Sequence, residues 1–129
     1  MYLLGLGHAA THWVAGTFYV LLPFMTKDLG LSYTQAGLLV SILHISSFFA
    51  NFGSGAVVDV TGRKVIFQVI SLGVGGVALL VFGFTGLYMV LCAMVALIGA
   101  TNNLWPPPAI SFISDRYPEN RGYALSIHA

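Results

Sequence analysis

Three histidines in apolar sequence are the side chains of this chain best suited to proton chemistry. His8 and His12 are four residues apart, so on a helix they share one face, and His44 follows in the next apolar segment. Imidazole groups in general titrate near pH 6.5, and no carboxylate occurs inside the apolar segments. The three histidines are therefore predicted to carry protons or to contact a substrate. A neutral role in hydrogen bonds between helices is the alternative.

Two neighbouring amides form a second group of candidate residues. Asn102 and Asn103 lie near the end of a long uncharged stretch. An amide in apolar surroundings is costly unless it is hydrogen-bonded. A substrate or helix packing could supply these hydrogen bonds. The run Pro106–Pro108 removes three backbone donors and predicts a break or kink in the helix there.

An acid and two bases lie close together between two apolar segments, in Gly55-Ala-Val-Val-Asp59-Val-Thr-Gly62-Arg63-Lys64. Gly62 would permit a positive φ in a tight reversal, and Gly55 would let another helix approach closely. Asp59 would lie near a helix C-terminus, where the helix dipole disfavours a negative charge. It therefore needs a partner, either Arg63 or the N-terminus of a helix elsewhere. A gate and a plain stop-transfer loop, with its bases at the headgroups, both fit this cluster.

The composition assigns most of the chain to a lipid bilayer. Of its 129 residues, 57% are hydrophobic and 7% are charged, whereas a soluble domain carries about 25% charged residues. The net charge of +1 gives no indication of nucleic acid as a partner. The single Cys92 excludes an internal disulfide. Because no nucleophile elbow, phosphate loop or metal-ligand set occurs, the sequence predicts no enzyme, no cofactor and no metal.

The charge-free stretches predict the elements that must position these residues. Residues 3–25 would span about 34 Å as a helix, enough for one crossing. Residues 65–114 contain no charge and would span about 75 Å, so they must fold back, near Gly83–Gly86. The predicted fold is all-α: a polytopic membrane protein with four transmembrane helices plus the start of a fifth, forming a partial N-terminal transmembrane domain over residues 1–129. The expected helices are 3–25, 34–58, 65–83 and 87–110, with the fifth starting at about 123.

The basic residues predict the orientation of the chain in the membrane. With the N-terminus in the cytoplasm, Arg63, Lys64, Arg116 and Arg121 fall inside and only Lys27 falls outside. This choice obeys the excess of bases on cytoplasmic loops. We therefore expect an integral protein of the prokaryotic plasma (inner) membrane.

The charged cluster resembles the signature loop of the major facilitator superfamily, Gly-x-x-x-Asp-Arg/Lys-x-Gly-Arg/Lys-Arg/Lys. The chain matches five of its six defining positions and has Val60 where a base is usual. Residues 116–125 also resemble the loop before the fifth helix in that superfamily. The resemblance covers the whole chain, but only the first four or so of about twelve helices. It implies an N-terminal fragment of such a transporter.

The resemblance implies a secondary active transporter that moves a small-molecule substrate by alternating access. The gate motif would consist of Gly55, Asp59, Gly62, Arg63 and Lys64. Its aspartate would tie the second helix to the missing C-terminal half of the transporter and hold the cytoplasmic side closed. Protons would be a further partner.

A finer resemblance concerns the fosmidomycin-resistance-like branch of drug exporters. It rests on His8-x-x-x-His12, Leu21-Leu22-Pro23, residues 29–37 and Ala124-Leu-Ser-Ile-His128. It implies proton-coupled efflux by an antiporter.

Two alternatives stay open. A small four-helix multidrug exporter that works as a dimer has a similar size, although such exporters depend on a glutamate inside the first helix and none is present. A non-transport membrane subunit could bind haem or a metal through His8 and His12.

Overall fold

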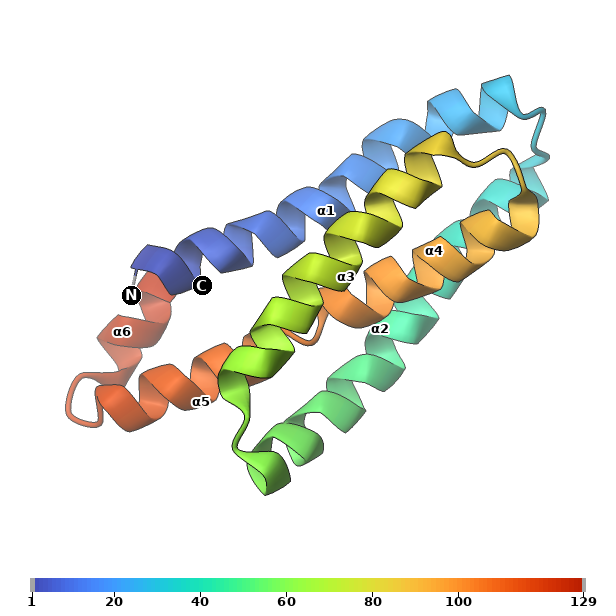
Figure 1. The fold of residues 1–129 in the computed structure, drawn as a ribbon. Coiled ribbons are helices and arrows are strands. Elements are labelled where there is room, and N and C mark those ends of the chain that lie inside the picture. The colour runs from blue at the N-terminus through green and yellow to red at the C-terminus, as the bar shows by residue number, and fades with distance from the viewer. Residues whose placement is uncertain (1, 129) are drawn as a thin grey trace.

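A computed structural model describes residues 2–128, without the side chain of His128, so that residues 1 and 129 of the expected domain lie outside it. The described residues form helices and contain no strand. This confirms the all-α fold class. The helices are α1 (Tyr2–Asp28), α2 (Tyr33–Thr61), α3 (Lys64–Phe84), α4 (Tyr88–Asn102), α5 (Pro106–Arg116) and α6 (Arg121–His128) (Figure 1).

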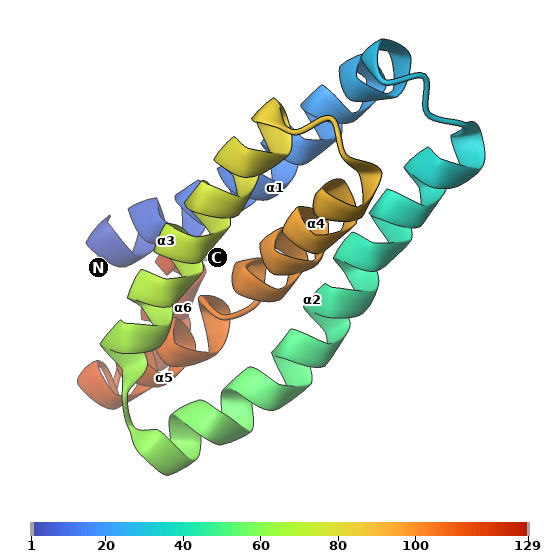
Figure 2. The same cartoon turned by 45° about the vertical axis from the view of Figure 1, so that its right-hand side comes forward.

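The long helices run up and down as a bundle with two distinct ends (Figures 1 and 2). The α1–α2 and α3–α4 turns meet at one end, where Leu29 approaches Gly86. We call this the hairpin end. The α2–α3 turn, α5 and α6 lie at the other end, which we call the basic end because it carries Arg63, Lys64, Arg116 and Arg121.

Local sequence explains where α2 begins and ends. Ser32 caps its N-terminus: the hydroxyl of Ser32 accepts a hydrogen bond from the Gln35 backbone N–H, and the Gln35 side chain accepts one from the Ser32 N–H. Gly62 closes the helix with φ 64°, and its N–H donates to the Val58 carbonyl at 2.8 Å. The positive φ expected at Gly62 is thus confirmed, because the left-handed conformation favours glycine.

The core lies where α4 packs against α2 and α3, while α1 packs mainly against α3 and α4. Small residues allow this approach: Gly99 of α4 faces the Leu43 carbonyl, and its own carbonyl accepts from the Ser47 hydroxyl at 2.8 Å. By contrast, α1 and α2 pack only weakly against each other. The buried core residues are Phe18, Leu39, Leu43, Ala78, Phe82, Leu91, Val95 and Ile98.

Three helical segments of the described chain are long and apolar enough to cross a membrane: Tyr33–Thr61, Lys64–Phe84 and Tyr88–Arg116. The chain is thus an all-α membrane protein with several crossings. Helix α1 is also long enough, at about 40 Å, but it is not among the three. Its polar residues, including His8, Thr11 and His12, reduce its apolar character, so its crossing stays a prediction.

The uncharged stretch at the end of α4 is divided, as its prolines predict. Instead of one helix over 87–110, α4 ends at Asn102 and α5 begins at Pro106. The first helical positions tolerate proline because their N–H groups have no partner within the helix. Trp105, the N-cap of α5, is buried, and its ring occupies the space where a Cβ of Gly7 would lie.

Candidate functional site

The histidines of α1 form a hydrogen-bonded pair. The Nε2 atoms of His8 and His12 are 2.9 Å apart, and the ring centroids are 4.7 Å apart. His12 is exposed, whereas His8 is half-buried. One ring must donate and the other must accept, so the pair holds at least one proton on facing nitrogens.

His44 pairs with a residue that the sequence analysis did not select. Its Nε2 lies 2.9 Å from the hydroxyl of Tyr19, which connects α2 to α1. Both side chains are exposed, Tyr19 to 42%. Tyr19 follows His12 by seven positions, or two helical turns, and this spacing was the signal that could have placed it on the histidine face of α1.

Asn102 and Asn103 lie at the break between α4 and α5. Asn102 is half-buried, and its Oδ1 has no hydrogen-bond partner among the described residues. The backbone carbonyl of Asn103 accepts a bond from the Ser54 hydroxyl at 3.4 Å. The Ser71 hydroxyl of α3 donates to the carbonyl of Thr101, the residue before Asn102, at 2.6 Å. Position and hydrogen bonding therefore place the amides at a helix junction, whereas the histidine pairs lie along α1 and α2.

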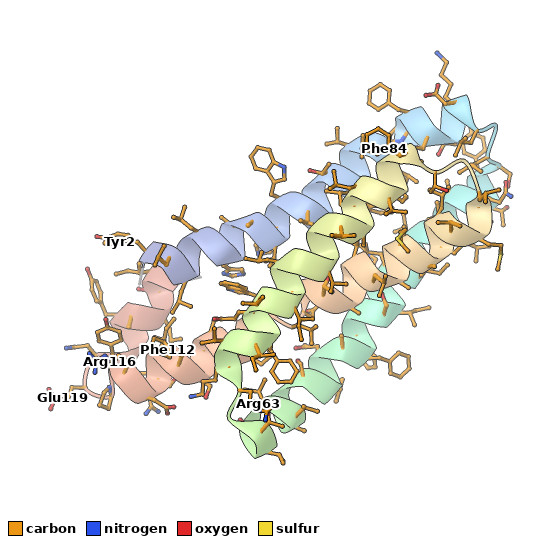
Figure 3. The ribbon with its side chains drawn as sticks, viewed as in Figure 1. Tyr2, Arg63, Phe84, Phe112, Arg116 and Glu119 are labelled. Carbon is orange, nitrogen blue, oxygen red and sulfur yellow. The ribbon has the colours of Figure 1, made fainter. Side chains whose placement is uncertain are left out.

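Gly62, Arg63 and Lys64 lie at the α2–α3 turn, where Figure 3 labels Arg63, and Gly55 and Asp59 lie on the last two turns of α2 before it. Asp59 and Arg63 are both exposed. Within residues 2–128 neither forms an ion pair, so Arg63 is not the partner of Asp59. The carboxylate remains near the C-terminus of α2, where the helix dipole favours a compensating positive group.

Lys64 is the base of the motif that does form an ion pair. Its Nζ lies 2.5 Å from Oδ2 of Asp115, and the two side chains are 22% and 72% exposed. The bond ties the first residue of α3 to the last turn of α5. The sequence analysis did not select Asp115, although its position next to Arg116 in a short charged stretch was visible.

Gly55 has no close neighbour within the described chain. Nothing lies within 4 Å of a Cβ built at Gly55. The glycines with close neighbours are Gly7, Gly75 and Gly99 instead. A close helix approach at Gly55 therefore requires a segment other than residues 2–128.

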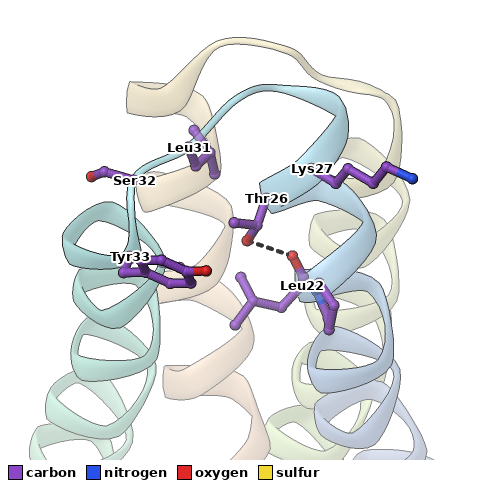
Figure 4. A pocket seen from close by; sticks show the side chains of 8 residues that line it. Leu22, Thr26, Lys27, Leu31, Ser32 and Tyr33 are labelled. Atoms are coloured by element: carbon purple, nitrogen blue, oxygen red, sulfur yellow. Dashed lines mark hydrogen bonds between the residues drawn. The ribbon is translucent and has the colours of Figure 1, made fainter.

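An open pocket of about 650 Å³ lies beside the α1–α2 turn at the hairpin end (Figure 4). The Thr26 hydroxyl in its wall donates to the Leu22 carbonyl at 2.7 Å. The Lys27 side chain extends away from Tyr33. Mainly apolar walls with a few hydroxyls suit an amphipathic solute. Its lining residues are Leu22, Pro23, Thr26, Lys27, Leu31, Ser32, Tyr33 and Ala36.

No group of three or more His, Cys, Asp or Glu side chains that could hold a metal ion occurs among the described residues. The paired rings of His8 and His12 offer two nitrogens, which is fewer than metal sites in proteins commonly use. The described chain therefore gives the metal alternative no further support.

Comparison with known proteins assigns the chain to a family. No curated protein and no solved structure matches it significantly. The family model described as Major Facilitator Superfamily matches residues 4–129, which is nearly the whole chain and includes the α2–α3 turn with its acid and two bases. Members of that family are secondary transporters of small solutes and not enzymes. The chain belongs to the major facilitator superfamily.

Proposed function

We propose that the chain is the N-terminal part of a proton-coupled secondary transporter that exports small amphipathic solutes by alternating access. The α2–α3 turn carries this proposal. Asp59 is exposed at the end of α2 without an ion-pair partner among residues 2–128, while Lys64 holds the same turn against α5. A fixed turn that presents an unpaired carboxylate suits a contact that forms in one state and breaks in another.

The partner of Asp59 would belong to the second half of the transporter. A cation or a helix N-terminus would be favoured opposite this carboxylate. Gly55, one turn earlier on α2, has open space around it and would let that partner approach. With the basic end in the cytoplasm, the contact would close the cytoplasmic side of the path.

Proton coupling is assigned to the histidine pair of α1. His8 and His12 face each other at 2.9 Å, and the carboxylates of the three apolar segments, Asp59 and Asp115, lie at the basic end instead. A proton bound by the pair would place a positive charge inside the membrane region, where charge must be neutralised or hydrated. Proton uptake would therefore favour the state in which this face is open to water.

Export of amphipathic compounds is supported by the mainly apolar pocket at the hairpin end and by the resemblance of α1 to drug exporters. The pocket of about 650 Å³ has room for a drug-sized molecule. Under the proposed orientation it opens on the outer side of the membrane.

The test uses the protein expressed from its complete reading frame and reconstituted in liposomes. An imposed pH gradient should drive the movement of an amphipathic dye such as ethidium. In Asp59→Asn the rate should fall by about tenfold, the effect of losing roughly 1.4 kcal/mol from one charged contact. Asp28→Asn is the matched control, because Asp28 is an exposed carboxylate at the hairpin end.

Unchanged transport in Asp59→Asn, with normal insertion, would remove the gating role. If the rate of dye movement by the unmodified protein is the same with and without a pH gradient, the proposed proton coupling is contradicted.

A further inference from the structure

A line of polar side chains follows one face of α1 and continues onto α2. His8, His12 and Tyr19 lie at positions that share a helix face, and Tyr19 reaches His44 across to α2. Tyr19 lies two turns from His12, or about 10 Å along the helix. Two hydrogen-bonded pairs thus follow each other along one strip of side chains, formed by His8, His12, Tyr19 and His44, which we call the groove.

The second pair lies where an exposed polar group needs water or protein around it. Tyr19 and His44 occupy middle turns of α1 and α2, away from Lys27 and Asp28 at the end of α1 and from Asp59 near the end of α2. Both are exposed in the described chain, and their hydrogen bond joins two helices that otherwise pack weakly. Because polar groups at this depth usually face a bundle interior or a hydrated path, we assign this face to such a path and not to lipid.

The helix surface between the two pairs is open. Ala15 and Gly16 separate His12 from Tyr19, and nothing lies within 4 Å of a Cβ built at Gly16. Beyond Tyr19, Leu22 and Thr26 of α1 line the open pocket at the hairpin end.

Few other titratable groups lie on the helices that pack against α1 and α2. On α4, the Tyr88 hydroxyl donates to the Gln35 carbonyl at 2.9 Å, and Cys92 lies one turn further along. On α3 the titratable residue is Lys64, which is paired with Asp115 at the basic end. The acid of α2, Asp59, is also at the basic end. His44 is thus the group that can take up a proton on its stretch of the groove.

We propose that Tyr19 and His44 form a second proton-binding site of the transporter, in which Tyr19 positions the His44 ring toward the groove. The inference rests on the proton coupling proposed above. In the neutral pair, the phenol O–H donates to Nε2 of His44. When a hydronium ion gives its proton to Nε2, a new N–H bond forms, water is left behind, and the phenol turns so that its oxygen accepts from the imidazolium. Water in the groove would carry protons between this site and the His8–His12 pair.

The test reads His44 directly and independently of transport. The protein from the complete reading frame, with ¹⁵N-labelled histidine rings, is placed in phosphatidylcholine nanodiscs and titrated by NMR. His44→Gln identifies the His44 signals. In Tyr19→Phe the midpoint of the His44 protonation curve should shift by about half a pH unit or more, which corresponds to the free energy of one hydrogen bond. Tyr2→Phe, on the same helix but 86% exposed near its start, should leave the midpoint unchanged.

A parallel transport assay tests whether the site takes part in coupling. The pH at which gradient-driven dye movement is half-maximal should shift in Tyr19→Phe together with the His44 midpoint, while the thermal unfolding temperature stays unchanged. If the midpoint of the His44 protonation curve is the same in Tyr19→Phe as in the unmodified protein, the site is overturned. The site is also overturned if that midpoint shifts while the pH profile of transport stays unchanged. If the unmodified protein shows no pH-driven transport at all, the proposed coupling fails first and the second site fails with it.

Discussion

Single glycines decide how closely the helices of this bundle approach one another. A Cβ at Gly99 would overlap the backbone carbonyl of Leu43, and one at Gly75 would lie 2.9 Å from the Thr101 hydroxyl. Backbone atoms cannot move aside as the end of a flexible side chain can. Gly99 therefore fixes the separation of α2 and α4, the helices that supply much of the core.

We expect Gly99→Ala to destabilise the protein by about 1–3 kcal/mol, because overpacking displaces helix backbone. The measurement is the thermal unfolding temperature of the purified protein in detergent micelles, followed by circular dichroism. Gly53→Ala is the matched control, since Gly53 is helical and nothing lies within 4 Å of a Cβ built there. An equal response of the two variants would contradict the close α2–α4 packing.

A second prediction at this scale concerns the proton on His12. His12→Ala should abolish dye movement driven by a pH gradient while leaving dye exchange without a gradient within about twofold, since exchange needs no net proton transfer. His12→Gln is the informative companion, because glutamine can hydrogen-bond to His8 but cannot carry a proton at neutral pH. Gradient-driven transport that survives in His12→Gln would reduce His12 to a packing role.

The sequence predicted some of these residues for sound physical reasons and missed others. Gly62 was predictable because only a tight reversal needs its positive φ. Tyr19 and Asp115 were missed because each gains its role from a partner far away in the chain, His44 and Lys64 respectively. Local spacing could place Tyr19 on the histidine face of α1, but it does not identify a partner on another helix.

Among the helices, α3 shows how a bundle uses an element that is apolar on all sides. After Lys64 at its start, Gln68 and Ser71 are its polar side chains, a composition that is typical of a helix facing lipid. The structure instead buries one face, which includes Ser71 and Gly75, against its neighbours, and it leaves Val69 and Val77 exposed. Composition could not separate the two faces because small residues and branched residues are both apolar.

The ion pair between α3 and α5 gives a prediction for these elements. A zero-length carbodiimide should join the Lys64 amine to the Asp115 carboxylate, because the two groups are already in contact. Mass spectrometry of digested protein would detect the new amide bond. The product should disappear in Asp115→Asn and persist in Asp59→Asn, although Asp59 is much closer to Lys64 in the sequence. A product between Lys64 and Asp59 would contradict the described turn.

For the whole molecule, the distribution of exposed apolar side chains points to surroundings other than water. Phe49 and Phe52 of α2 are 69% and 74% exposed, and Phe84 at the end of α3 is 90% exposed. Such surface is normal against acyl chains or against further helices of a transporter. The sequence predicted this environment well, because 7% charged residues cannot cover a soluble surface. It could not predict which faces meet lipid, since the pattern of packing depends on all helices together.

Cysteine labelling at the ends of α1 and after α2 tests the predicted orientation of the chain in the membrane. Single cysteines at positions 2, 27 and 63, in a Cys92→Ala background, would mark the two ends of α1 and the turn after α2. An impermeant maleimide applied to intact cells should label position 27, whereas positions 2 and 63 should react only in inside-out vesicles. The expectation follows because α1 and α2 each extend about 40 Å and meet at the hairpin end.

Glu119→Cys provides the matched control for this experiment, since Glu119 is exposed at the basic end and should label together with position 63. Labelling of positions 2 and 27 from the same side would show that α1 does not cross, and the path assigned to its histidine face would then lose one wall. Labelling of positions 27 and 63 from the same side would contradict α2 as a crossing. If position 27 labels from the inside and positions 2 and 63 label from the outside, the fold stands but the orientation is inverted. Asp59 and its turn would then lie on the outer face. In that case Asp59 could not close the cytoplasmic side, because the carboxylate would lie across the bilayer from it.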